Sequence, residues 1–184
     1  AIYRFPAHNM CRFNDLIDHA ENAGVRIVNM SMGSYSQDDW TCFHDGAKQH
    51  PHILFVISAG NDGFDIDVNP VFPASFDLEN IVVVTSSDLF GRLPPQSNYG
   101  RVSVDLMVPA EQVDVFDHRG VFTTASGSSF AAPRVAALAA RFLKKNVEAS
   151  TTDIINFLKS RAINSGSTPV RFGWIPDPSD DFKL

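Results

Sequence analysis

Short runs rich in Val and Ile alternate with helical patterns along the chain, and this alternation constrains the fold more than any other feature. Two of the runs, 53–58 (ILFVIS) and 81–86 (IVVVTS), are almost continuously apolar. Such strands are typical of a parallel sheet covered on both faces, whereas a strand with one solvated face alternates apolar and polar residues. The runs 26–30 and 102–109 share the Val/Ile bias and complete the set of predicted strands.

Helical patterns occupy the segments between and after these strands. The predicted helices are 11–23, 37–50, 130–145 and 150–162. Gly24 follows the first as a stop signal, and the third carries its lysines at the carboxyl end, where the helix dipole favours cations. Strands and helices in this order predict an α/β domain with a mainly parallel sheet and helices on both faces. Residues 1–184 are long enough for one such domain.

The composition excludes several classes of protein. Hydrophobic residues make up 44% of the chain and charged residues 20%, which is typical of globular domains and not of disordered segments. The net charge is −6, and the longest basic run is Lys144-Lys145, so we expect no nucleic-acid partner. No apolar run approaches the roughly 20 residues that span a bilayer, so we expect no membrane segment.

The chain has two cysteines, Cys11 and Cys42. They either form a disulfide or remain as two buried thiols, and the sequence does not decide between these states. No spacing of cysteines and histidines resembles a zinc site, so we assign no metal ligand.

Small polar residues and glycines follow the predicted strands and precede the third helix. The segments are 31–33 (SMG), 59–62 (AGND) and 126–133 (SGSSFAAP). The carboxyl ends of parallel strands are where functional residues gather. Each segment also has a plain structural interpretation: the first two favour turns, and Ser128 or Ser129 would cap the helix, with Pro133 in its first turn.

Taken together, these segments resemble the subtilisin-like serine proteases, the subtilases. GSSFAAPR resembles the family's Gly-Thr-Ser-Met-Ala-Ser-Pro-His, SAGN its Ala-Ala-Gly-Asn, and VNMSMGS its Val-Ile-Asn-Met-Ser-Leu-Gly. FPAS with NIVVVTSSD, SNYG and DLMVPA also have family counterparts. The matches run in family order from about Ile2 to about Ala162.

The resemblance implies a serine endopeptidase with Ser129 as the nucleophile and Asn61 as an oxyanion donor. A serine hydroxyl attacks well only when a base removes its proton. At a helix amino terminus, the Ser129 N–H and the Asn61 amide would donate to the oxyanion of the tetrahedral intermediate.

The resemblance also implies a substrate cleft for a peptide or protein. Ser31, Met32 and Gly33 would pair with an extended peptide as an added strand. Ser58, Ala59 and Gly60 would line the other wall of the pocket for the residue before the cut. Val71 would form its floor, which gives a shallow pocket for small or medium side chains.

The aspartate and histidine motifs of a subtilase, Asp-Thr/Ser-Gly and His-Gly-Thr-His, do not occur in this sequence. None of the six histidines has the required neighbours: His8, His19, His44, His50, His52 and His118. We expect His44, His50 and His52 in solvent or near a helix cap. Residues 1–5 (AIYRF) resemble the strand that follows the family's histidine helix, so we expect both residues upstream of Ala1.

The chain is therefore expected to be the serine- and oxyanion-bearing fragment of a catalytic domain, without its amino-terminal strands and inactive alone. Three arrangements would complete the sheet: a second chain with the Asp/His segment, a copy of this chain, or a shift of residues 2–5. The alternative function is a non-catalytic subtilase-like domain that binds peptides or a partner protein. An esterase is disfavoured because GSSFA lacks the second glycine of Gly-x-Ser-x-Gly. Many subtilases are secreted and bind calcium, but no acidic cluster here identifies ligands, so we assign neither cofactor nor localisation.

Overall fold

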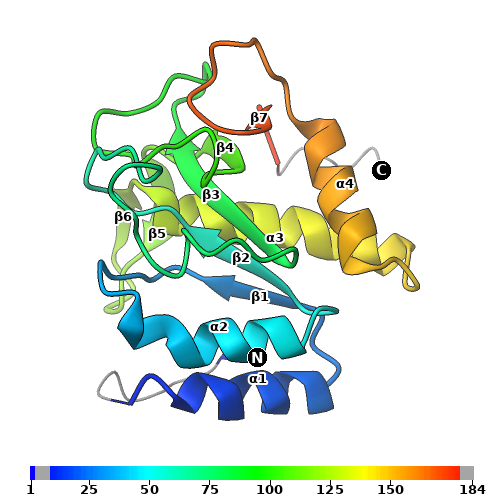
Figure 1. The fold of residues 1–184 in the computed structure, drawn as a ribbon. Helices are drawn as coiled ribbons and strands as arrows, with labels where there is room; N and C mark the ends of the chain where they lie inside the picture. The colour runs from blue at the N-terminus through cyan, green and yellow to red at the C-terminus, as the bar shows by residue number, and fades with distance from the viewer. Residues whose placement is uncertain (3–8, 179–184) are drawn as a thin grey trace.

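A five-stranded sheet lies between two helical layers in the computed structural model, which describes residues 1–2 and 9–178 (Figure 1). The strand order is β1-β2-β3-β4-β7, and every neighbouring pair is parallel. The strands are β1 (Ile27–Met30), β2 (Leu54–Ser58), β3 (Ile81–Ser87), β4 (Leu106–Pro109) and β7 (Gly173–Trp174). The predicted α/β class with a mainly parallel sheet is confirmed.

Alternate residues of the central strands point to opposite faces of the sheet. Phe55 and Ile57 of β2 pack into a core with α1 (Arg12–Asn22) and α2 (Thr41–Gln49). These two helices form one layer, below the sheet in Figure 1. Cys11 and Cys42 form a disulfide that joins the amino-terminal ends of the two helices, which settles the state that the sequence left open.

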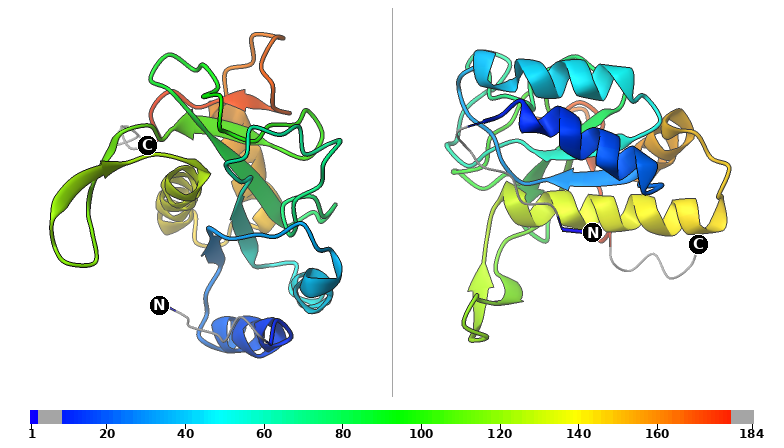
Figure 2. Two further views of the ribbon diagram at one scale, coloured as in Figure 1. Left: turned by 90° about the vertical axis from the view of Figure 1, so that its left-hand side faces the viewer. Right: turned by 90° about the horizontal axis from the view of Figure 1, so that it is seen from below.

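The opposite face of the sheet is covered by α3 (Ser128–Lys145) and α4 (Thr151–Arg161). Leu54 and Val56 of β2 face this second core, where the small residues of α3 allow the helix to pack closely on the sheet. Figure 2 shows α3 running along the sheet on the side away from α1 and α2. Because both faces are buried, all five residues of β2 are buried, as its continuous apolar run predicts.

Most predicted elements differ from the structure by one or two residues at an end, and two differ by more. In the run 102–109 only β4 is a strand, because the backbone N–H groups of Val102 and Ser103 donate to the Asp67 carboxylate and not to a strand ladder. The segment 37–50 divides into a short 3₁₀ helix, η1 (Asp38–Trp40), and α2. Most of the strand predicted at 2–5 lies outside the described residues.

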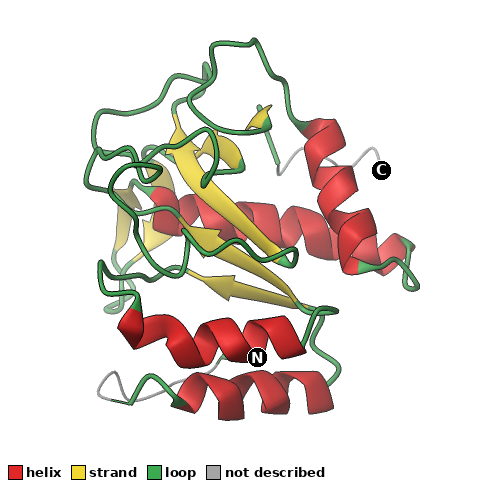
Figure 3. Cartoon of the chain, in the orientation of Figure 1, coloured by secondary structure: helices red, strands yellow, loops and turns green. Residues whose placement is uncertain are grey.

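An antiparallel hairpin of β5 (Val113–Phe116) and β6 (Phe122–Ala125) was not predicted (Figure 3). Its side chains are largely exposed, so it lacks the apolar run that identified the central strands. Within the described part of the chain, no helix combines the length and apolarity needed to cross a membrane.

One ionisable side chain is buried within the sheet region. Asp105 immediately precedes β4, and its Oδ2 accepts the Val83 N–H at 2.9 Å. The Arg171 guanidinium is 3.8 Å from its Oδ1. Burial outweighs these stabilising contacts and raises the pKa of Asp105 to about 6.

We predict that Asp105→Asn stabilises the protein more at pH 7 than at pH 4. The raised pKa means that the folded state favours the protonated acid, so the favourable contribution is complete below the unfolded pKa and is lost as pH rises through about 6. The variant cannot ionise, and its stability relative to wild type should increase by up to about 3 kcal/mol between these pH values. Urea unfolding at both values measures this, and a pH-independent difference would contradict it.

Candidate active site

The carboxyl-terminal ends of β1 and β2 lie near the amino terminus of α3 (Figure 1). Gly60, which follows β2, donates its N–H to Ser128 Oγ at 3.1 Å. Ser31, which follows β1, donates its hydroxyl to the Ser129 carbonyl at 3.0 Å. The segments that follow β1 and β2 are thus both hydrogen-bonded to the start of α3, which lies tens of residues later in the sequence.

Asn61 caps α3 from a distant part of the chain. Its Oδ1 accepts the Ser128 N–H at 2.8 Å and the Ser128 hydroxyl at 3.0 Å. The N-cap position is Gly127, which has no side chain to satisfy the helix's first donors. The plain structural interpretation, in which Ser128 or Ser129 caps the helix, does not hold, because Asn61 supplies the capping oxygen. Ser128 instead donates its hydroxyl to Asn61 Oδ1.

Gly127 leaves room for this contact. Its φ of +122° is rarely adopted by residues with a side chain, and a Cβ there would lie 2.8 Å from Asn61 Oδ1. A larger residue would therefore both strain the turn and displace Asn61.

Pro133 lies in the second turn of α3 and not in the first, which corrects the expectation from sequence. Proline has no N–H, so the carbonyl four residues earlier, that of Ser129, loses its helical donor. The Ser31 hydroxyl donates to this carbonyl instead. The proline therefore makes possible a direct link between the end of β1 and the start of α3.

Two hydrogen-bond donors and one hydroxyl remain unpaired at this helix terminus. Among the described residues, neither the Ser129 N–H nor Asn61 Nδ2 has an acceptor, and the Ser129 hydroxyl has no hydrogen-bond partner. Ser129 is half-buried and Asn61 is exposed. A small anion or a polarised carbonyl oxygen is the group that such donors bind, with added support from the helix dipole.

Two of the predicted cleft residues, Ser31 and Gly60, contact this terminus. Ser31, Met32 and Gly33 are exposed, whereas Ser58 and Ala59 are buried and Gly60 is partly exposed. Val71 is 6% exposed and lies beside Gly33, since a Cβ on Gly33 would be 3.3 Å from Val71 Cγ1. The backbones of Ser34 and Phe72 pair through two hydrogen bonds of 2.8 Å, which hold these two segments together.

Asn98 is a positioning residue that the sequence did not assign. It is fully buried, and its Nδ2 donates to the Ala59 carbonyl at 2.9 Å. Its Oδ1 accepts the N–H groups of Asp62 and Phe64, at 3.0 and 2.9 Å. Asn98 therefore fixes the loop that carries Asn61, and it belongs to the SNYG segment whose family resemblance was the available signal.

The histidines on α2 and the turn after it are engaged elsewhere. His44 contacts Asp45, and His50 and His52 contact carboxylates of α1. His50 is the C-cap residue of α2 and its side chain is only 12% exposed, so of the two expected positions it takes the helix cap and not solvent. No histidine or aspartate of the described residues is hydrogen-bonded to Ser129.

A family model described as the subtilase family matches residues 5–174. The alkaline elastase YaB of Bacillus sp. (strain YaB) is 31% identical over 154 residues, which cover 84% of this chain and 39% of the elastase. Subtilisin-like protease 1 of Plasmodium berghei (strain Anka) is 26% identical over 178 residues, covering 86% of this chain and 29% of that protein.

Solved structures agree with this match. A cold-adapted subtilisin-like serine proteinase superposes with a TM-score of 0.75 at 28% identity, covering 91% of this chain and 61% of that one. The protease domain of PatA gives a TM-score of 0.77 at 24% identity, and the match covers 96% of this chain and 65% of the PatA chain. The chain thus spans less than two thirds of the length of each of these proteins.

Proposed function

Because the chain belongs to the subtilase family of serine peptidases, we propose that it is the serine-bearing part of an endopeptidase that forms an acyl-enzyme on Ser129. The observation that carries this proposal is the unpaired Ser129 hydroxyl beside two unpaired donors, its own N–H and Asn61 Nδ2. A nucleophile and an oxyanion site require this combination.

The proposed reaction begins when Ser129 Oγ attacks the peptide carbonyl carbon while a histidine base takes the hydroxyl proton. The carbonyl oxygen becomes an oxyanion and accepts hydrogen bonds from the Ser129 N–H and Asn61 Nδ2. When the tetrahedral intermediate collapses, the C–N bond breaks and the histidine protonates the leaving amine. Water then hydrolyses the acyl-enzyme by the same route. The chemistry uses side chains and water alone, so we propose no catalytic cofactor.

We propose that the substrate is an extended peptide between two walls. Residues 31–33 are exposed and follow the sheet's edge strand, so their backbone can pair with a peptide as an added strand. Residues 58–60 form the other wall, and Val71 closes the pocket for the residue before the cut. Its isopropyl group beside Gly33 leaves a shallow pocket.

The missing base and its aspartate are proposed to come from a segment that pairs with β1. Within residues 1–2 and 9–178, β1 pairs only with β2, so its other edge has free backbone groups. A cavity of about 440 Å³ adjoins that edge and is lined by apolar side chains of α1 and β1, including Phe13, Ile17, Val28 and Met30. The segment belongs either to a longer polypeptide or to a second chain. A copy of this chain would cover the edge but would bring neither triad motif.

The alternative, a non-catalytic domain that binds peptides, is favoured by one observation: no base among the described residues is hydrogen-bonded to Ser129. It shares the cleft with the protease and differs in whether the hydroxyl can be activated. The next experiment therefore distinguishes the two.

We predict that a fluorophosphonate probe labels Ser129 only when a segment with both triad motifs is supplied by co-expression. The chain alone should remain unlabelled, because no base among the described residues is hydrogen-bonded to Ser129. Ser129→Ala should abolish labelling of the completed protein, and Ser126→Ala, a change at an exposed serine of the same loop, should preserve it. Labelling of the isolated chain at Ser129 would show that it contains its own base, and an unlabelled completed protein would favour the peptide-binding function.

We predict that Asn61→Ala and Asn61→Asp both lower kcat of the completed protein by about 10²–10³, the loss known for a side-chain oxyanion donor of subtilisin, from which we take the magnitude. Only Asn61→Ala should also lose the helix cap, at about 1 kcal/mol of stability, because Asp retains an acceptor for the Ser128 N–H. Peptide kinetics and thermal unfolding separate the two effects. A wild-type kcat in Asn61→Asp would show that the Asn61 amide does not stabilise the oxyanion.

We predict that the completed protein prefers small or medium side chains before the cut, and that Val71→Gly extends this preference to aromatic residues. Removing the isopropyl group deepens the pocket beside Gly33. A peptide library profiled with both proteins measures the change. A wild-type profile dominated by large aromatic residues would refute the proposed floor.

A further inference from the structure

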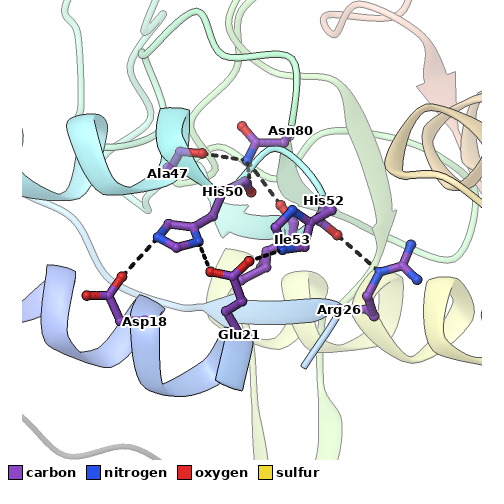
Figure 4. A network of polar contacts seen from close by, with 8 residues as sticks. All are labelled: Asp18, Glu21, Arg26, Ala47, His50, His52, Ile53 and Asn80. Atoms are coloured by element: carbon purple, nitrogen blue, oxygen red, sulfur yellow. Dashed lines mark hydrogen bonds and ion pairs between the residues drawn. The ribbon is translucent and has the colours of Figure 1, made fainter. Parts of the chain in front are cut away.

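Three side chains that can bind a metal converge where α1 ends and α2 turns into β2 (Figure 4). Glu21 lies in the last turn of α1, His50 directly follows α2, and His52 lies two residues further on. One ligand atom from each lies within 4.8 Å of the other two. The proposed peptidase reaction uses none of them.

The Glu21 carboxylate faces both imidazole rings. Its Oε2 lies 2.5 Å from His50 Nδ1, and its Oε1 lies 2.7 Å from His52 Nε2. The contact with His50 lacks the direction of a hydrogen bond, and Nδ1 is a buried nitrogen with no hydrogen-bond partner among the described residues. Both contacts join a carboxylate oxygen to an imidazole nitrogen, and these are atom types that bind a transition-metal ion.

Asp18 orients His50 for this role. Its Oδ1 lies 3.0 Å from His50 Nε2, the nitrogen on the other side of the ring. When Nε2 carries the proton and donates it to Asp18, the lone pair of Nδ1 points toward Glu21. Histidines that bind metals are commonly held in this way, by a carboxylate on the nitrogen that does not touch the ion.

The backbone that carries both histidines is held by polar contacts from Asn80 and Arg26 (Figure 4). Asn80 Nδ2 lies within 3.1 Å of the carbonyl oxygens of Ala47, His50 and Ile53. Arg26 Nε donates to the His52 carbonyl at 3.2 Å. Because the turn is held in place, binding an ion there would cost little backbone entropy.

We propose that Glu21, His50 and His52 bind a divalent transition-metal ion, zinc by preference, with water as the fourth ligand. Two imidazole nitrogens and one carboxylate suit zinc, whereas calcium and magnesium take oxygen ligands. Tetrahedral zinc places its ligand atoms roughly 3.3 Å apart. The Glu21 and His52 side chains are 40% and 48% exposed, so both can make the small shift required.

The proposed ion has a structural role. The Cys11–Cys42 disulfide joins the amino-terminal ends of α1 and α2, and the ion would join the carboxyl-terminal end of α1 to the turn after α2. The two helices would then be connected at both ends, beside the cavity that adjoins β1.

The test is a zinc titration of the metal-free chain by calorimetry, with circular dichroism to verify that each variant is folded. We expect one saturable site whose affinity falls at least tenfold in His52→Ala and in Glu21→Gln, and about tenfold in Asp18→Asn. The control is His118→Ala, which removes an exposed histidine outside the cluster and should bind zinc as the wild type does.

A second readout is independent of peptidase activity. Zinc should raise the Tm of the wild type and of His118→Ala, but not that of His52→Ala, because an ion that binds only the folded state stabilises it. Cobalt should give a visible spectrum that is lost in the same variant. An absence of saturable binding, or an affinity that His52→Ala leaves unchanged, would overturn the proposal.

Discussion

The hydrogen bond between the Ser128 N–H and Asn61 Oδ1 is the contact on which the rest of the site depends. It ties the loop after β2 to the first turn of α3, across 67 residues of sequence. One half of the amide is used for this link, so the other half, Nδ2, is held in place with its proton donors free. Asn98 also holds this loop, because its Nδ2 donates a hydrogen bond to the Ala59 carbonyl. A single side chain therefore has both a structural role and the role that we propose for it in catalysis.

Much of the fold could be predicted from the sequence, and the reasons differ between elements. The runs that became β2 and β3 are buried on both faces, so their composition alone identifies them. Helix α4 begins at Ser150 with a reciprocal pair of hydrogen bonds to Asp153, a signal that is local in sequence. The start of β4 was misplaced because Val102 and Ser103 donate to Asp67, more than thirty residues away. The β5–β6 hairpin was missed because its residues face solvent.

The candidate site was likewise only partly predictable from the sequence. Ser129 and Asn61 were predicted as site residues because short family motifs surround them, and the structure places their segments in contact. The function of Pro133 was not predictable, because it depends on Ser31, a residue about a hundred positions earlier that contacts the Ser129 carbonyl. The Glu21–His50–His52 cluster gave no signal either. Its members lie on separate elements, without the regular spacing by which metal sites are usually found in a sequence.

The bond from Ser31 to the Ser129 carbonyl has a mechanical consequence. Ser31 belongs to the segment 31–33 that we propose binds a peptide, and its hydroxyl also holds the backbone of Ser129, the residue that we propose as the nucleophile. A displacement of residues 31–33 by a bound peptide would therefore act on the Ser129 backbone through this hydrogen bond. The peptide-binding role that we propose for residues 31–33 and the nucleophilic role that we propose for Ser129 would then be coupled through this one hydrogen bond.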